Sequence, residues 1–337
     1  MLDPRTTVAI LKVAAEPTRL RILLLLRDCE LNVKDLTRIL GQSQPRVSRH
    51  LKLMAEVGLV QRHQDGSWAY FQLSDHGAAA DVLRGILARV DGRDGTLTRD
   101  AQRAEAIKDE REAAAQTYFR EHAGDWDKIR ALHVAEQAVE AGVRAALGDR
   151  PLHTLVDLGT GTGRMLELLA DRYERGIGLD INQTMLAYAR MKLEAAGTAN
   201  ASVRHGDLYD VALPSASADA VVMHQVLHFL IEPQHAIREA ARILAPGGRV
   251  VIADFAPHEL EFLRERFAHE RLGFPIGQVK EWLQAAGLTD VDARIVASSN
   301  PDATEKLTVT LWTAVKPARA GVRMDPGHAL KVEASSP

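Results

Sequence analysis

The sequence predicts two domains of different fold class: an α+β domain of helices with one hairpin, and then an α/β domain with a mostly parallel sheet. Helical patterns and a two-residue hairpin turn fill the chain up to about residue 90. A glycine-rich turn then follows a buried strand at 152–158, and acidic residues end the strands after it. A length of 337 residues fits about two domains. We expect domains at 1–91 and 118–316, a helical linker at 92–117 and a flexible tail at 317–337.

The composition is typical of a globular protein, with 46% hydrophobic and 26% charged residues. Residues 1–91 hold 13 Lys and Arg against 10 Asp and Glu, whereas the rest holds 29 against 35, so the front is mildly basic. Cys29 is the single cysteine, which excludes an intramolecular disulfide and a thiolate zinc cluster. No apolar run approaches the ~20 residues that span a bilayer, and no signal peptide is evident, so we expect a cytoplasmic protein without membrane contact.

Helical patterns in the front half predict a helix-turn-helix. Apolar segments at 8–14 and 20–26 come first, with Pro17 in the first turn of the second. The next pattern runs to Leu40, and Gly41 ends it. Ser43 is then expected to cap a further helix over 44–57. Two helices joined by a short turn with glycine are typical of this motif.

The last of these helices has one apolar and one polar face. Val47, Leu51 and Met54 recur at helical spacing and are expected to face the core, with His50 packed beside them. The opposite face suits a DNA groove, because Arg can bind guanine, Gln can bind adenine, and Ser and Lys can bind phosphate. The residues expected on it are Gln44, Arg46, Ser48, Arg49 and Lys52.

A hairpin follows this helix directly. Alternating patterns at 58–62 and 68–73 flank Asp65-Gly66, a strong two-residue turn signal. Arg62 lies at the base of the hairpin and could reach backbone phosphate. Exposed basic residues are often merely solvated, but the order of helix, turn, helix and hairpin favours a winged helix that binds DNA.

The connector begins with a break at 91–96 and continues as a long, charged, exposed helix at 97–115. This helix could be a rigid strut, or it could pair with its twin in a dimer through Leu97, Ala101, Ala104 and Ile107. The aromatic residues that follow could cover a ligand pocket or simply pack; they are Tyr118, Phe119 and Trp126. A further amphipathic helix is expected at 129–147.

A glycine-rich turn opens the back half. The strand at 152–158 contains Asp157, and Gly159-Thr160-Gly161-Thr162-Gly163 leads into a helix expected at 164–173. Such a turn brings backbone N–H groups close to a ligand at a helix N-terminus. Asp180 ends the next strand about 20 residues on, where such folds hold ribose hydroxyls. This spacing alone also fits a nicotinamide dinucleotide.

Later strands narrow the choice of ligand. Asp207 follows a third strand, a fourth begins at Ala218, and Leu244-Ala-Pro-Gly-Gly248 precedes a strand at 249–254. His224, Gln225 and His228 follow the fourth strand, where a substrate-facing group could lie. The spacing of the two histidines invites a metal, but no third ligand is evident, so we expect polar lining and no metal.

The front half resembles the ArsR-type winged-helix repressors over residues 5–90. The resemblance lies in EPTRLRILLLL at 16–26 and in SQPRVSRHLKLMAEVGLVQRHQDGSWAYFQL at 43–73. It implies a homodimer on pseudo-palindromic, double-stranded operator DNA. Metal-sensing members carry ELCVCDL where this chain has ELNVKDL, so Asn32 and Lys34 replace both thiolates. Asp75 and His76 alone are too few for a metal site, and the metal or arsenic signal of the family is not carried over.

The back half resembles the class I S-adenosylmethionine-dependent methyltransferases over residues 117–315, in the order D-x-G-x-G-x-G, acidic strand end, GD and LxPGG. The resemblance implies a Rossmann-like fold with a seven-stranded, mostly parallel sheet. It also implies binding of S-adenosylmethionine or S-adenosylhomocysteine, with the methionine moiety at the glycines, the ribose at Asp180 and the adenine at Asp207. The expected cofactor-binding set is Asp157, Gly159, Thr160, Gly161, Gly163, Asp180, Ile181, Asp207, Leu208 and His224.

The sequence leaves the catalytic residues and the methyl acceptor unknown. It has no (N/D)PPY run for amino groups of nucleic acid and no cysteine for a covalent pyrimidine adduct in this half. Our leading hypothesis is a transcriptional regulator that binds an adenosyl ligand and controls genes of the methionine and methyl cycle. The alternatives are an active small-molecule methyltransferase with an autoregulatory DNA-binding domain, and a DNA-binding protein with a vestigial pocket.

Overall fold

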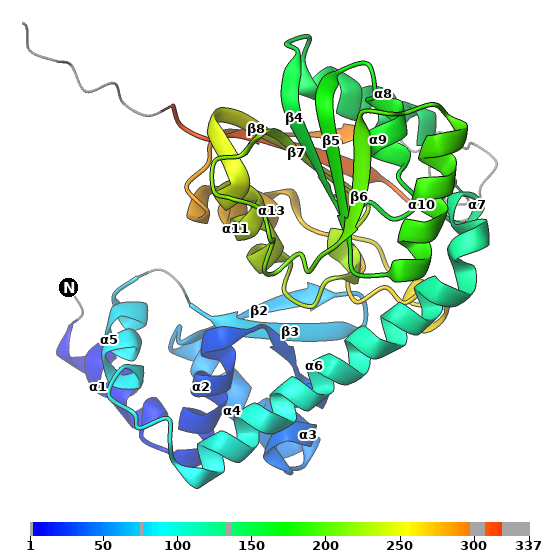
Figure 1. Ribbon diagram of the computed structural model, residues 1–337. Coiled ribbons are helices and arrows are strands. Elements are labelled where there is room, and N and C mark those ends of the chain that lie inside the picture. Colours follow the sequence, from blue (N-terminus) through cyan, green and yellow to red (C-terminus); the bar gives the residue numbers. More distant parts are fainter. Residues whose placement is uncertain (1–2, 75–76, 132–135, 297–306, 319–337) are drawn as a thin grey trace, which may run out of the picture.

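The computed structural model describes residues 3–74, 77–131, 136–296 and 307–318. Figure 1 shows two lobes, with the long helix α6 (Gly95–His122) running along both. Asp75, His76 and the expected tail from residue 319 onward lie outside the described residues.

The first lobe is a winged helix-turn-helix. A three-stranded antiparallel sheet in the order β1-β3-β2 closes a cluster of helices. The core is apolar and includes Ile22, Leu36, Leu51 and Met54. The elements are α1 (Pro4–Ala14), α2 (Pro17–Asp28), β1 (Leu31–Asn32), α3 (Val33–Leu40), α4 (Gln44–Glu56), β2 (Val60–Asp65), β3 (Trp68–Leu73) and α5 (Ala78–Leu87).

Local chemistry sets the ends of these elements. Helix α1 begins at Pro4 rather than at residue 8, because the Asp3 carboxylate accepts from the backbone N–H of Arg5 at 2.9 Å. Ser43 occupies the N-cap of α4 as expected, yet its hydroxyl makes no capping bond there. Strand β2 begins at Val60, two residues later than expected.

Helix α6 is longer than the sequence pattern indicates, and it does not stand free. It begins at Gly95, where Asp94 caps it, and it includes Tyr118 and Phe119. Arg21 of α2 makes a bidentate ion pair with Asp100 at 2.6 and 2.7 Å. Ile107 is buried in the core of the first lobe, so part of the stripe that was considered for dimer pairing packs within the chain.

The second lobe is built on a seven-stranded sheet in the order β6-β5-β4-β7-β8-β10-β9. Strands β4 to β8 run parallel, and β10 is antiparallel to both of its neighbours. This matches the expected Rossmann-like fold. The strands are β4 (Leu152–Leu158), β5 (Tyr173–Asp180), β6 (Ala201–His205), β7 (Ala218–His224), β8 (Leu244–Phe255), β9 (Thr289–Val296) and β10 (Val309–Val315).

Helices and short 3₁₀ turns surround this sheet (Figure 1). They are η1 (Ala123–Asp125), α7 (Trp126–Ala131), α8 (Glu136–Leu147), α9 (Arg164–Leu168), α10 (Gln183–Ala195), η2 (Leu227–Phe229), α11 (Pro233–Ile243), α12 (Phe262–Arg266) and α13 (Ile276–Ala285). The helix expected at 129–147 corresponds to α7 and α8, and residues 132–135 of that span lie outside the described residues.

The expected helix at 164–173 is wrong at its C-terminal end. Helix α9 stops at Leu168, and Tyr173 begins β5. Tyr173 pairs with Leu152 of β4, and its buried hydroxyl donates to the Leu166 carbonyl at 2.7 Å. Strand pairing and a satisfied hydroxyl therefore outweigh the helical pattern at this residue.

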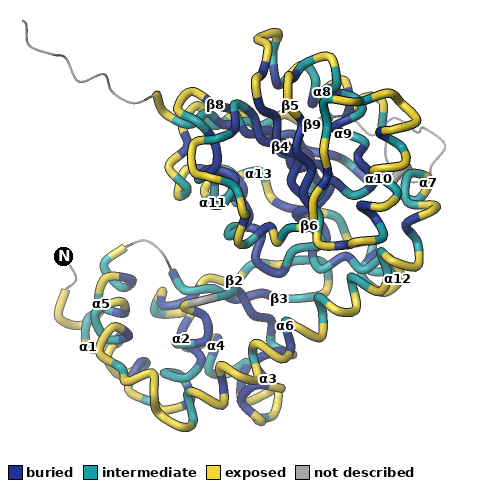
Figure 2. The backbone as a smooth tube through the Cα atoms, in the orientation of Figure 1, coloured by how far each residue is buried: buried dark blue, intermediate teal, exposed yellow. Residues whose placement is uncertain are grey.

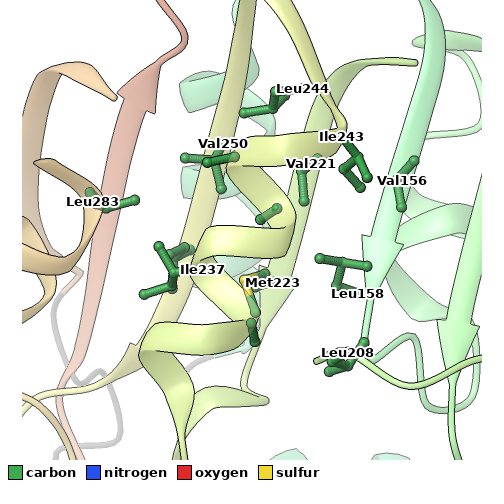
Figure 3. Close-up of a cluster of buried hydrophobic side chains, with 14 of the residues drawn as sticks. Val156, Leu158, Leu208, Val221, Met223, Ile237, Ile243, Leu244, Val250 and Leu283 are labelled. Carbon is green, nitrogen blue, oxygen red and sulfur yellow. The ribbon is translucent and has the colours of Figure 1, made fainter. Parts of the chain in front are cut away.

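The central strands are buried on both faces (Figure 2). On one face, α11 packs Ile237 and Ile243 against Val221 and Val250 (Figure 3). Strands covered on both sides are near-continuous apolar runs, as β7 and β8 are here. Among the residues that the structure describes, no helix is both long and apolar enough to cross a bilayer.

Candidate adenosyl pocket and DNA-binding face

The main cavity of the second lobe lies at the carboxyl ends of β4, β5 and β7 and measures about 150 Å³. The sheet order places β4 between β5 and β7. Strand β5, which follows β4 in the chain, pairs with one edge of β4, and the later strand β7 pairs with the other edge. Open α/β sheets bind ligands in the crevice at such a point.

The glycine-rich turn forms one wall of this cavity. Gly159 and Gly161 have φ of +77° and +52°, which side chains rarely adopt. A Cβ on Gly159 would lie 2.9 Å from Val226 Cβ and nearer still to its Cγ2. The hydroxyl of Thr160 donates to the Asp157 carboxylate at 2.6 Å, which holds the turn against the end of β4.

Asp180 lies across the turn at the end of β5. One carboxylate oxygen accepts from Gly161 N–H at 2.9 Å, and the other accepts from Asn182 N–H at 2.8 Å. Loss of solvation raises the pKa of Asp180, although these two N–H groups act to lower it. The carboxylate therefore has a fixed orientation at the cavity wall, and each oxygen keeps lone-pair capacity for a hydroxyl ligand.

Nine of the ten residues expected to bind cofactor line this single cavity: Asp157, Gly159, Thr160, Gly161, Asp180, Ile181, Asp207, Leu208 and His224. Gly163, the tenth, does not line it. Gly163 is the N-cap of α9 with a φ of +83°, and a Cβ there would lie 3.3 Å from the Ala189 side chain. Gly163 thus allows α9 and α10 to pack closely.

Helix α6 supplies a wall of which sequence reasoning named only Phe119 as a candidate. Glu112, Ala115, Gln116 and Phe119 line the cavity. The side-chain oxygen of Gln116 accepts a hydrogen bond from the side-chain amide of Asn182 at 2.9 Å. This bond connects α6 to the segment that follows β5. A polar helix without a strong apolar stripe carries no pattern that assigns it to a pocket. The aromatic residues were the available signal, and both Phe119 and Trp126 line the cavity.

A second, smaller cavity adjoins the first, and both are lined by Trp126, Gln225 and Phe229. His228 and several aromatic rings complete it, including Tyr118, Phe255 and Phe267. Buried His228 shares a hydrogen bond of 2.7 Å with Asp254 through Nδ1. Asp254 also accepts from the N–H groups of Leu227 and Phe255. A carboxylate held in this way fixes the histidine ring and directs Nε2 away from it.

Gln225 lies between the two cavities in a strained conformation. Its φ is +51°, and its buried side-chain Nε2 has no hydrogen-bond partner within the described part of the chain. Non-glycine residues in this region cost about 1–3 kcal/mol and cluster at functional sites.

The expected DNA-binding face lies on α4. Val47, Leu51 and Met54 are buried, whereas Gln44, Arg46, Arg49 and Lys52 are exposed and Ser48 is half-buried. Arg62 is exposed on β2, where its guanidinium donates to the Gln64 side chain at 2.6 Å. His50 is half-buried, and desolvation lowers its pKa. The predicted outward face of α4 is therefore accessible.

Comparisons with known proteins assign a type to each lobe. Residues 16–62 match the model of the bacterial regulatory proteins of the arsR family, and residues 156–252 match the methyltransferase domain model. Over these residues the first lobe therefore matches an arsR-type helix-turn-helix, and the second lobe matches a methyltransferase domain.

Individual relatives match one half each. The arsenical resistance operon repressor of Escherichia coli is 46% identical over 70 residues, which cover 20% of this chain and 60% of the repressor. A Mycolicibacterium smegmatis protein named as a probable S-adenosylmethionine-dependent methyltransferase is 30% identical over 156 residues, 42% of this chain and 59% of that protein. The chain thus spans about three fifths of the length of these two relatives.

Among solved structures, a methyltransferase–activator complex from Haloferax volcanii contains a chain that is 25% identical to this one, with a TM-score of 0.50. The match covers 59% of this chain and 97% of that chain.

Replacing Gly159 by Ala is expected to abolish adenosyl-ligand binding, because the added methyl group strains the turn and meets Val226. Gly197→Ala is the matched control, since Gly197 also has positive φ but faces open space within the described structure. Calorimetric titration with S-adenosylhomocysteine measures both. Equal affinity of the two variants would contradict the placement of the ligand at this turn.

Replacing Arg49 by Ala is expected to weaken operator binding and to leave adenosyl-ligand affinity unchanged. Loss of a base contact typically costs about 1–3 kcal/mol. Arg93→Ala removes an exposed arginine that pairs with Asp91, well outside α4, and serves as control. Fluorescence anisotropy at low and physiological salt measures the difference. Operator affinity that is unchanged at both salt concentrations refutes our choice of recognition face.

Proposed function

We propose that this protein is a DNA-binding transcriptional regulator whose methyltransferase domain binds S-adenosylmethionine or S-adenosylhomocysteine as its signal. The observation that carries the proposal is the position of α6. One part of this helix packs into the core of the first lobe at Ile107. The next turns line the adenosyl pocket with Glu112, Gln116 and Phe119. A ligand that displaces α6 would therefore also act on the helix-turn-helix.

Arg111 supports this coupling because it contacts both lobes. Its guanidinium pairs with Asp35 of α3 at 2.5 Å and with Glu270 of the second lobe at 2.9 Å. Arg111 is neighbour to Glu112 in the pocket wall. Asp35 lies in the first turn of α3, the helix that precedes the recognition helix α4. A movement of α6 would thus be transmitted to α3 by a short, partly buried ion pair.

The run ELNVKDL supports a change of signal relative to metal-sensing proteins of ArsR type. Asn32 caps α3 by accepting from Asp35 N–H at 2.9 Å. Glu30 forms an ion pair with Arg271 of the second lobe at 2.9 Å. The segment that holds thiolates in those proteins here makes contacts to the ligand-binding lobe, so we infer that it receives the adenosyl signal instead.

The proposal extends to the target genes, the oligomeric state and the location of the protein. Both adenosyl compounds belong to cellular methyl transfer, as donor and product, and genes of the methionine and methyl cycle are therefore the expected targets. We expect a homodimer on double-stranded operator DNA, since exposed Val8 and Leu11 on α1 offer an apolar contact surface. Action on operator DNA implies a cytoplasmic location.

Operator affinity is expected to change when either adenosyl compound is added, by about 5- to 150-fold for an ordinary allosteric coupling. Arg111→Lys should still bind DNA and the adenosyl ligand but lose most of this coupling. In Arg111 one guanidinium nitrogen pairs with Asp35 and another with Glu270, and the single nitrogen of an ammonium group cannot reproduce this planar fork. Arg99→Lys, an exposed position on the same helix, is the control. Anisotropy titrations of upstream DNA with and without ligand measure the coupling. If neither compound changes the operator affinity of the wild-type protein, the proposal is contradicted.

A second candidate function is methyl transfer to a small molecule, and the pair of His228 and Asp254 favours it. A histidine oriented by a buried carboxylate can take a proton from an acceptor hydroxyl, amine or thiol. The aromatic cavity around it opens next to the adenosyl pocket, where an acceptor must lie.

If the protein is an enzyme, His228→Asn should lower methyl transfer from labelled S-adenosylmethionine to a small-metabolite extract by about a hundredfold or more. Affinity for S-adenosylmethionine should stay unchanged. His153→Asn, at an exposed position, is the control. Absence of labelled product with wild-type protein, or equal turnover of both variants, argues against this second function.

A further inference from the structure

The tip of the hairpin formed by β2 and β3 is covered by the second lobe. We call residues 60–73 the wing and residues 259–272 the docking segment. Asp65 at the turn accepts from the backbone N–H of Leu272 at 2.8 Å, and the backbone N–H of Ser67 donates to the Glu261 carboxylate at 2.5 Å. A Cβ on Gly66 would lie 2.6 Å from Leu272 Cδ1, so the contact admits only glycine at the turn without a shift. Figure 1 shows the hairpin lying along the face of the second lobe.

Cations of the docking segment cover the aromatic face of β3. The Arg264 guanidinium lies 4.3 Å from the ring centre of Trp68, and that of Arg271 lies 3.8 Å from the ring centre of Tyr70. Desolvated cation–π contacts of this kind stabilise an interface. The Tyr70 hydroxyl donates to the Glu270 carboxylate at 3.1 Å, and burial raises the pKa of Tyr70.

The charged groups at this contact are paired and buried. Arg264 and Asp65 are 3.2 Å apart, and their side chains are 8% and 9% exposed. Loss of solvation raises the pKa of Asp65, while Arg264 and Arg271 act to lower it. Burying charges is favourable only where the partners meet with good geometry, which identifies the contact as a specific docked state of the wing.

This docked state competes with DNA. A hairpin next to a recognition helix reaches backbone phosphate in winged-helix proteins, and Arg62 lies on this hairpin. In the docked state the tip is surrounded by Glu261 and Leu272 and cannot meet a phosphate. Glu261 would also repel the phosphate backbone if it stayed in place. The tip of the wing can therefore contact either the docking segment or the operator, whereas Arg62 at its base stays exposed in the docked state.

We propose that the docking segment is an autoinhibitory latch that holds the wing away from operator DNA, and that operator binding opens it. The inference rests on the proposed DNA-binding function and adds a device that regulates it. The latch is connected to the adenosyl pocket, since the N–H groups of Glu270 and Arg271 donate to the carbonyl of His228 in η2 at 2.9 and 3.0 Å. Phe229, the next residue, lines the pocket.

Variants on the docking segment test the latch without altering any DNA-facing residue. Glu261→Ala removes the acceptor of Ser67 N–H and should raise operator affinity about tenfold, the effect of losing one charge-assisted hydrogen bond that only the closed state makes. Glu265→Ala is the matched control, because it removes the same charge from an exposed position on α12. If the two variants bind operator DNA with the same affinity, the latch proposal is wrong.

Amide hydrogen exchange of the wild-type protein gives a second readout. The N–H groups of Ser67 and Leu272 should be protected in the free protein and lose protection when operator DNA saturates it. Continued protection of both amides in the DNA complex refutes the latch while the proposed function stands. Failure of the wild-type protein and the Glu261→Ala variant to bind any upstream DNA refutes the proposed function itself.

Discussion

The relation between the two lobes depends on one buried ionic contact, that of Arg111 with Asp35 and Glu270. The side chain of Asp35 is almost wholly buried, with 1% of its surface exposed, and the side chain of Glu270 is 13% exposed. Buried carboxylates without a cation are strongly unfavourable, and losing one partner of such a pair typically costs about 3–5 kcal/mol. Arg111 compensates two carboxylates at once, one from each lobe. Loss of solvation acts to lower the pKa of Arg111, yet both carboxylates raise it, so the guanidinium stays charged.

Further contacts extend this ionic interface. Arg271 pairs with Glu30, Arg264 pairs with Asp65, and Lys108 of α6 pairs with Glu232 at 2.9 Å. Ionic interfaces depend on geometry more strictly than apolar ones, because a small displacement leaves charges unpaired in a place where water cannot solvate them. An interface of this kind is suited to two discrete arrangements rather than to gradual sliding. It can therefore respond to a ligand that binds one arrangement better than the other.

The adenosyl pocket could largely be predicted from sequence, because its key residues follow local rules. Gly159 and Gly161 require positive φ, and Asp180 and Asp207 follow strand ends that meet at one edge of a parallel sheet. The buried face of α4 followed in the same way from the spacing of Val47, Leu51 and Met54. These features depend only on the spacing of apolar residues along an element or on the residues of a turn. Both can be read from a single sequence.

Features that depend on the meeting of distant segments were not predictable. Arg111 and Asp35 are 76 residues apart, and Asp65 and Leu272 are 207 apart. No local pattern relates them. The long exposed helix expected at 97–115 also contacts both lobes, since its sparse apolar residues are complemented by ion pairs that a hydrophobic pattern does not record. The end of α9 was missed for a similar reason, because pairing of Tyr173 with Leu152 is a tertiary effect.

The most direct test of the coupling between pocket and DNA is its reciprocity. If an adenosyl compound changes operator affinity by some factor, the operator must change the affinity for that compound by the same factor. Calorimetric titration of S-adenosylhomocysteine into the free protein and into the operator complex measures this. We expect dissociation constants that differ by the factor found in the DNA titration. Identical dissociation constants in the two titrations would show that the lobes bind their ligands independently, and would contradict a regulator that senses an adenosyl compound.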